Sequence, residues 1–259
     1  MSDGPDRIAL AQEELERLMK DRFERPMPKR FYEKVTVGGA PPALSIELDG
    51  KPLRTPMKAL LEAPTRALAE TMAEEWRAQG ANIDPFAMPL TRLANTAIDR
   101  VRPRRDEVIA AIRAHGAHDL LCYRMREPVA FAMLQQKTWD PLLEWAEAQV
   151  GGSFLIAEGV MPVTQPRETL EGLTRRYGAF GDFQLAALSD LATLSGSAIL
   201  PLAVATGRLS ATRAWEAATL DETWNMRLWG TDREAEARLA LREREFAAAA
   251  RLLELLKKP

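Results

Sequence analysis

The residues with the clearest chemical potential lie near the C-terminus, where three carboxylates follow a tryptophan. Asp232, Glu234 and Glu236 come directly after Trp229 and a glycine. Asp232 and Glu236 are four residues apart, so a helix places both on one face. The group fits an acid/base pair, a metal site or a docking surface for another protein, and arginines interleaved with the acids also fit a solvated helix face. The spacing leaves these interpretations open, although the sequence supplies neither a sugar cleft nor a catalytic partner for the acids.

A second group brings together imidazole and thiol side chains, which are the usual ligands of zinc. It comprises His115, His118, Asp119 and Cys122, but the chain has only two histidines and one cysteine. A stable zinc site normally needs a distant second pair of ligands, and none exists here. Apolar neighbours of Cys122 predict a buried thiol with a raised pKa. We therefore expect no metal, no cofactor and no nucleophilic cysteine.

Signature motifs of several enzyme classes are missing from the sequence. It contains no phosphate-binding loop, no dinucleotide fingerprint, no nucleophile elbow and no zinc-protease helix. Arg92 and Asn95 could bind an anion, or equally hydrogen-bond to the other domain or to a nearby loop. We expect no catalytic residue. The alternative is a small-molecule enzyme with its site in the cleft between two domains, around Arg92, Asn95 and Glu236.

Composition limits the partners and the location of the protein. A formal net charge of -2 and a pI near 5.9 provide no basic field for nucleic acid. No apolar run is long enough to cross a bilayer, and the N-terminal residues lack the apolar core of a secretory signal. A single cysteine fits a reducing compartment. We expect a monomeric cytoplasmic protein whose partners are proteins or small molecules.

Strand patterns are confined to the first half of the chain. Residues 30–37 and 44–48 alternate apolar and polar side chains, and Asp49-Gly50 then predicts a hairpin turn. A short strand follows at 60–62, and Thr65 is a candidate cap for a helix ending at Gly80. Further helices are predicted at 90–101 and 104–114, with a strand at 119–124.

Helical patterns dominate the rest. We predict helices at 129–150, interrupted or restarted at Asp140-Pro141, and at 167–177, 182–195, 197–205 and 210–228, with an extended segment at 151–166. A last helix begins near Thr231, where Thr231 and Glu234 match a capping box. The prediction is an α+β fold with a mobile N-terminal arm at 1–28. A small domain of antiparallel hairpins and packed helices follows at 29–125, then an all-helical domain at 126–259.

Eight segments resemble, in order, the ATP-twelve-type assembly chaperones, the family of mitochondrial ATP synthase assembly factor 2. The segments are RFYEKVTV, LDGKPLRTP, APT followed by LAETMAEEW, MPLTRLANTAID, DLLCYR, WDPLLEWA, LDETW and WGTDREAEAR. The resemblance extends from about Arg30 to Leu253, nearly the whole chain. Each is modest alone, and together they are specific.

The resemblance implies a chaperone that is neither an enzyme nor dependent on ATP. Such a protein binds the newly made α subunit of the soluble catalytic head of F-type ATP synthase and keeps it soluble until the β subunit replaces it. The family's acidic position in the terminal region maps onto Glu234 or Glu236. The resemblance thus favours a docking role for Trp229, Asp232, Glu234 and Glu236, with Arg92 and Asn95 as further candidates, in a bacterial cytoplasmic protein.

Overall fold

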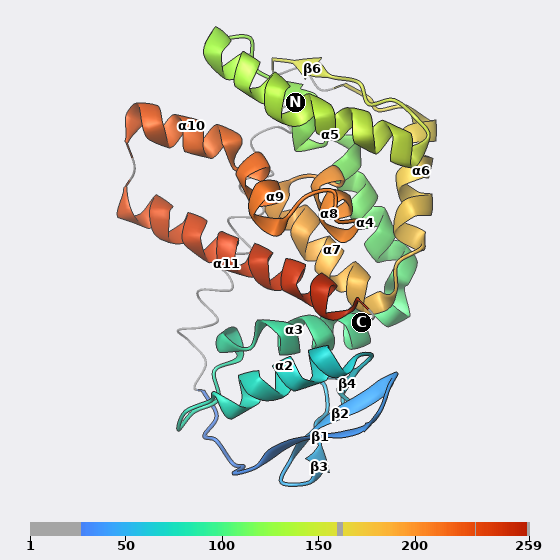
Figure 1. The fold of residues 1–259 in the computed structure, drawn as a ribbon, viewed down its shortest axis with the longest axis vertical. Coiled ribbons are helices and arrows are strands. Elements are labelled where there is room, and N and C mark those ends of the chain that lie inside the picture. The colour runs from blue at the N-terminus through green and yellow to red at the C-terminus, as the bar shows by residue number, and fades with distance from the viewer. Residues whose placement is uncertain (1–26, 160–162, 231, 258–259) are drawn as a thin grey trace. The chain divides into compact units, whose positions relative to one another are not determined.

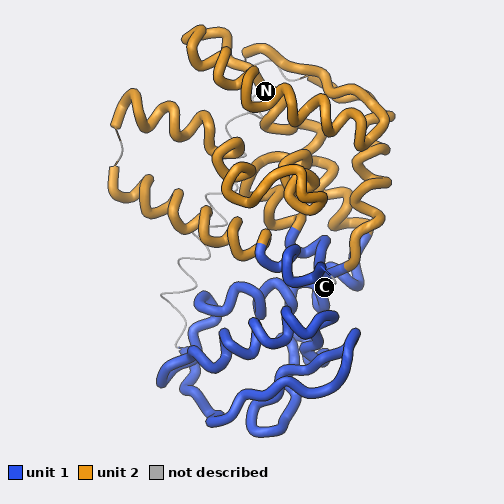
Figure 2. The backbone as a smooth tube through the Cα atoms, in the orientation of Figure 1, with its two compact units in different colours: residues 1–105, 182–187, 251–259 blue, residues 106–181, 188–250 orange. Residues whose placement is uncertain are grey.

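The computed structural model describes residues 27–159, 163–230 and 232–257, which form two compact units (Figure 2). Unit 1 contains the described residues up to 105, together with 182–187 and 251–257. Unit 2 contains the described residues of 106–181 and 188–250. The predicted arm at 1–28 lies outside the described residues except for Met27 and Pro28, and the domain ranges 29–125 and 126–259 stay a prediction.

Unit 1 is built on a small antiparallel sheet (Figure 1). The sheet consists of β1 (Val35–Ala40), β2 (Ala43–Leu48), β3 (Lys51–Pro52) and β4 (Glu62–Ala63), with β2 paired to the other three. Asp49 and Gly50 both have positive φ, 49° and 76°, as the two central residues of a tight hairpin turn require. The predicted turn is confirmed, while the first strand begins at Val35 rather than at residue 30.

Helices of unit 1 cover the sheet with apolar side chains. They are α2 (Arg66–Arg77), η1 (Pro85–Ala87), α3 (Pro89–Thr96), the π-helical turn η2 (Ala97–Val101) and η3 (Arg102–Arg104). The Thr65 hydroxyl accepts a hydrogen bond from the Leu68 amide, which confirms the predicted cap of α2. Leu68 and Met72 of α2 are buried together with Leu44 and Ile46 of β2. Their burial removes the apolar faces of helix and sheet from water at the same time.

Unit 2 is almost entirely helical. Its elements are α4 (Arg105–Ala117), η4 (Leu120–Cys122), β5 (Tyr123–Arg124), α5 (Val129–Val150), β6 (Ala157–Glu158), α6 (Arg167–Gly178), α7 (Asp182–Ser195), α8 (Ile199–Ala205), α9 (Ala211–Ala218), α10 (Leu220–Trp229) and α11 (Arg233–Leu255). The first residue of α4, the start of α7 and the end of α11 are counted with unit 1. No helix within the described ranges is long and apolar enough to cross a membrane.

Three local predictions for this region were wrong. Helix α5 continues through Pro141, although proline removes one amide donor from the helix. Residues 119–124 form a 3-10 turn and a two-residue strand rather than one strand. The predicted helix 210–228 is two helices divided at Thr219, whose hydroxyl donates to the Trp215 carbonyl at 2.8 Å. In each case packing against the rest of unit 2 outweighs local pattern.

A buried carboxylate joins two segments inside unit 2. Asp119 accepts hydrogen bonds from the amides of Leu121, Ala198 and Ile199 at 3.1, 2.7 and 3.1 Å. Burial raises the pKa of this carboxyl to about 6, and hydrogen bonds from Ser197 and from these amides partly oppose the rise. Asp119 therefore fixes the start of α8 against η4.

Candidate interaction surface

The turn between α10 and α11 presents a tryptophan to solvent. Trp229 is the last residue of α10 and is 85% exposed, and its neighbour Leu228 is also exposed. Gly230 follows with φ 82° and ψ 173°, a conformation that only glycine adopts without strain. The chain leaves the helix at this glycine, so α10 ends with its aromatic side chain unburied.

Carboxylates begin the next helix. Asp232 accepts a hydrogen bond from the Ala235 amide at 2.7 Å and so caps α11, while Glu234 pairs with Arg238 at 2.7 Å. Asp232, Glu234 and Glu236 are all exposed. Thr231, the other half of the predicted capping box, lies outside the described residues.

An ion pair ties α10 to α11 behind this turn. One guanidinium nitrogen of Arg242 lies 2.8 and 2.9 Å from the two carboxylate oxygens of Glu222. A second nitrogen donates to the Leu194 carbonyl at 3.1 Å, and the guanidinium lies 5.4 Å from the centre of the Trp215 ring. Arg242 thereby fixes the two helices to the core of unit 2 while their ends remain exposed.

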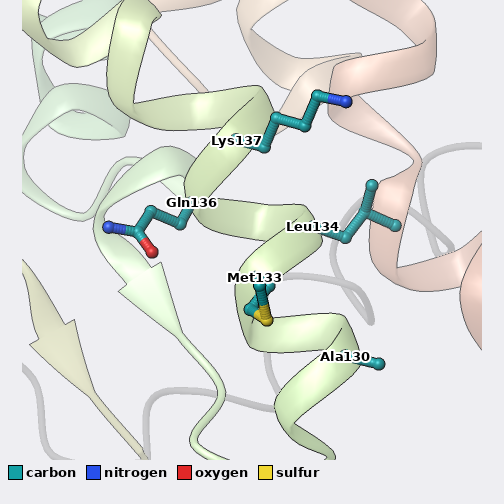
Figure 3. Close-up of a pocket in the computed structure, with 5 residues that line it drawn as sticks. All are labelled: Ala130, Met133, Leu134, Gln136 and Lys137. Carbon is teal, nitrogen blue, oxygen red and sulfur yellow. The ribbon is translucent and has the colours of Figure 1, made fainter.

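Helix α5 has an apolar face that the structure leaves open. Val129 and Met133 are one turn apart and exposed, Met133 by 64%, and Met125 just before the helix is exposed too. An open surface hollow of about 450 Å³ lies on this part of the helix. Figure 3 shows Leu134 and Lys137 pointing to one side of α5 and Gln136 to the other. The hollow is lined by Ala130, Met133, Leu134, Gln136 and Lys137.

The start of α5 and the end of α10 lie at the same end of an antiparallel helix pair (Figure 1). Phe131 stacks on Trp224 with ring centres 4.9 Å apart, and Gln135 donates to Asp221 at 3.1 Å. Residue numbers fall along α5 as they rise along α10, so the exposed end of α10 is level with the residues just before α5. We call the exposed residues at this end the apolar edge, and it consists of Met125, Val129, Met133, Leu228 and Trp229.

Buried polar groups hold the apolar edge in place. The Gln135 side chain accepts a hydrogen bond from the Met125 amide at 2.9 Å and donates to Asp221, so it joins three segments. Burial raises the pKa of Asp221, and Glu222 adds to the rise, whereas the hydrogen bond from Gln135 and the charge of Arg124 oppose it. Protonation of the Asp221 carboxylate is therefore easier in the folded protein than in water.

Arg92 and Asn95 belong to α3 in unit 1, whereas the other four predicted residues belong to unit 2. The Arg92 guanidinium lies 5.7 Å from the centre of the Phe86 ring. Beside it, the carboxylate of Glu75 accepts hydrogen bonds from the two amides at positions 90 and 91 and from the hydroxyl at position 91. This internal carboxylate already occupies the anion-binding start of α3.

The candidate zinc ligands are used differently. Asp119 is saturated by backbone amides, and burial raises the pKa of the Cys122 thiol far above its usual range, with Asp119 adding to the effect. Among residues 27–159, 163–230 and 232–257, no three His, Cys, Asp or Glu side chains form a group that could hold a metal ion. The predicted burial of the Cys122 thiol is confirmed.

The sequence contains a signal for the apolar edge, although the predicted site did not include the residues of α5. Residues 129–134 are six consecutive apolar residues at the start of a helix. A helix on the surface of a protein buries only one stripe, so a segment that is apolar all round must leave part of it exposed or covered by a partner. Phe131 faces inward, and Val129 and Met133 face outward.

The fold and this surface define an α+β protein with an exposed apolar edge beside carboxylates. A family model described as ATP12 chaperone protein matches residues 29–147. The crystal structure of Atp12 from Paracoccus denitrificans matches with 41% identity over 89% of this chain and 99% of that chain, with a TM-score of 0.84. The structure of a point mutant of the same Atp12p matches with the same identity and TM-score, over 89% of this chain and 98% of that chain.

A third structure, the Atu1473 protein from Agrobacterium tumefaciens, is 39% identical over 97% of this chain and 100% of that chain, with a TM-score of 0.84. These likenesses extend well beyond the segment that the family model matches. The chain belongs to the ATP12 chaperone family, and the predicted resemblance and α+β fold class are confirmed.

Proposed function

We propose that this protein is an assembly chaperone for the α subunit of the catalytic head of F-type ATP synthase. It binds the unassembled α subunit and keeps it soluble until the β subunit takes its place. It acts as a monomer in the bacterial cytoplasm, by binding alone, without ATP and without catalysis. The observation that carries the proposal is the apolar edge, an exposed apolar surface on a member of a chaperone family.

The physical reason lies in what an unassembled subunit exposes. A subunit without its neighbour shows a large apolar interface, and such patches drive aggregation. Trp229 offers a large rigid contact, and exposed tryptophans are frequent binding hot spots. Met125 and Met133 have flexible, polarisable side chains that adapt to an irregular apolar surface. The apolar edge is therefore suited to cover such an interface temporarily.

Carboxylates beside the edge would make the contact selective. Asp232, Glu234 and Glu236 start α11 directly after Trp229. Exposed charges change the rate of association and the choice of partner more than they change affinity, so they favour a client with arginines and keep its release possible. We propose Arg92 and Asn95 as further contacts made by unit 1.

Coexpression tests the function directly. The α subunit is produced alone, with this protein, and with an unrelated protein of similar size, and the soluble fraction of α is measured. We expect α to stay soluble only with this protein. Equal aggregation of α in all three cases would disprove the proposed function.

A pull-down experiment tests the carboxylates. Asp232→Asn removes a charge but keeps a good helix cap, and Glu236→Lys reverses a charge on the exposed face. We expect this double variant to capture much less α subunit with an unchanged far-UV spectrum. Glu243→Lys, a charge reversal at an exposed position further along α11, is the matched control. Equal capture by the double variant and the control would remove the start of α11 from the binding site.

A further inference from the structure

Unit 1 carries an exposed apolar side chain of its own, on the loop between β3 and β4. Met57 is 75% exposed at the tip of this loop, and Leu60 beside it is exposed too. The Thr55 amide donates to the Ala59 carbonyl at 2.9 Å, so the loop is a closed turn rather than an open excursion. A fixed turn thus presents a methionine to solvent.

Asp99 of the π-helical turn η2 holds this loop in place by two hydrogen bonds. It accepts hydrogen bonds from the Thr55 hydroxyl at 2.7 Å and from the Met57 amide at 3.0 Å, one on each carboxylate oxygen. The Thr55 oxygen in turn accepts the Ala59 amide at 3.1 Å. Single π-helical turns are frequent at functional sites, and here the turn carries the residue that orients Met57.

Lys58 adopts a backbone conformation that favours glycine. Its φ is 68°, which costs a side-chain-bearing residue about 1 kcal/mol or more. The Arg54 guanidinium donates to the Lys58 carbonyl at 2.8 Å and stabilises the turn. Glycine would adopt this backbone conformation without strain. The positive charge of Lys58 is therefore present at this position at a cost in stability.

Two cations lie on the same loop as Met57, and a third follows the aspartate that holds the loop. Arg54, Lys58 and Arg100 are exposed, and within the described parts of the chain none forms an ion pair. Glu62, the carboxylate nearest to the loop in sequence, pairs with Arg102 at 3.0 Å. Asp99 contacts the loop directly, and both of its oxygens already hold it. We call Met57 with these three cations the basic loop.

We propose that the basic loop is a docking site for an acidic segment of a partner protein, with an apolar side chain seated on Met57. Charge complementarity carries the choice of occupant, because exposed cations around a hydrophobic centre attract alternating acidic and apolar residues. Three cations on a chain of net charge -2 suit a short acidic peptide better than the many phosphates of a nucleic acid. The inference concerns unit 1 and does not rest on the proposed function.

Fluorescence anisotropy of the full-length protein with a labelled 12-residue peptide of alternating glutamate and leucine tests the site. We expect binding that weakens with added salt and falls at least 10-fold in the double variant Lys58→Glu with Arg100→Glu. Met57→Ser should weaken binding several-fold. Lys34→Glu, next to the Asp49 turn and outside the basic loop, is the matched control and should bind like the unmodified protein.

Far-UV spectra and thermal unfolding establish that each variant is folded. Unchanged peptide binding by the double variant would overturn the proposal, as would absence of binding by the unmodified protein. A peptide of alternating lysine and leucine that binds equally well would show that leucine alone is recognised, and a 12-nucleotide oligothymidine that binds more tightly would show a nucleic-acid site. Either result would also overturn the proposal.

Discussion

Trp229 in unit 2 and Met57 in unit 1 are both highly exposed apolar side chains, but they are held differently and have opposite charges nearby in sequence. Trp229 in unit 2 is the last residue of α10. Gly230 ends the helix there, and carboxylates follow at the start of α11. Met57 in unit 1 lies on a loop that is fixed by Asp99 and that also carries Arg54 and Lys58. The apolar side chain supplies contact area in both, whereas the charges around it decide which partner is attracted.

The difference teaches that exposure alone does not define a binding surface. Leu155 and Ile156 are also exposed, and hydrogen bonds to Gln165 fix Leu155, yet no cluster of one charge lies beside them in sequence. Isolated exposed apolar residues are normal in soluble proteins. The apolar edge and the basic loop stand out because charges of one sign follow or flank each of them in sequence.

The largest expected effect comes from removing the apolar edge. Trp229→Ala with Met133→Ala should weaken capture of the α subunit by about 1,000-fold, because hot-spot residues contribute about 2 kcal/mol or more each. Both side chains are exposed, so the thermal unfolding temperature should stay the same. Leu155→Ala is the control, and equal capture by all three proteins would show that the apolar edge does not bind the client.

The anchoring carboxylates give the next effect, because Asp119 is buried and Asp99 is not. Since the pKa of Asp119 is raised to about 6, the folded state binds its proton more tightly than the unfolded state does. This contribution to stability is present below about pH 4 and is lost as the pH rises through 6, by up to about 3 kcal/mol.

Urea unfolding at several pH values measures this effect. Asp119→Asn should flatten the dependence of unfolding free energy between pH 4 and 6 relative to the unmodified protein, whereas Asp99→Asn should leave that dependence in place. A parallel pH dependence in the Asp119→Asn variant would show that other groups cause it.

Removing the loop anchor should have a smaller effect. Asp99→Ala deletes the acceptor of two hydrogen bonds, and we expect it to lower the free energy of unfolding by about 2 kcal/mol. It should also weaken binding of the acidic peptide by loosening Met57. Glu33→Ala, an exposed carboxylate elsewhere in unit 1, is the control. Equal stability of the two variants would show that Asp99 does not hold the loop.

The smallest effect tests the strain at Lys58. Lys58→Gly relieves about 1–2 kcal/mol of strain and adds about 0.5–1 kcal/mol of backbone entropy to the unfolded chain, so stability should rise by about 0.5 kcal/mol. Affinity for the acidic peptide should fall at the same time. Lys51→Gly in strand β3 has no such strain to relieve and should lower stability. Similar losses in both variants would remove the argument from strain.

Local signals predicted local structure well. The Asp49-Gly50 turn and the Thr65 cap follow from interactions between residues at most a few positions apart, and both were confirmed. The course of α5 through Pro141 and the break at Thr219 were predicted wrongly. Trp139, two residues before Pro141 and fully buried, donates to the Ala217 carbonyl at 3.0 Å. Such packing lies beyond the range of any local pattern.

By itself the sequence determined the fold class, the family, the small hairpin sheet and the group Trp229, Asp232, Glu234 and Glu236 as neighbours. These depend on composition, periodicity and short spacings, which the chain carries whatever its tertiary arrangement. Only the tertiary structure decided that Val129 and Met133 face outward on the helix that packs beside α10, and that Asp99 holds Met57 from 42 residues away. Contacts of that length arise from packing, because burial of apolar faces selects which distant segments meet.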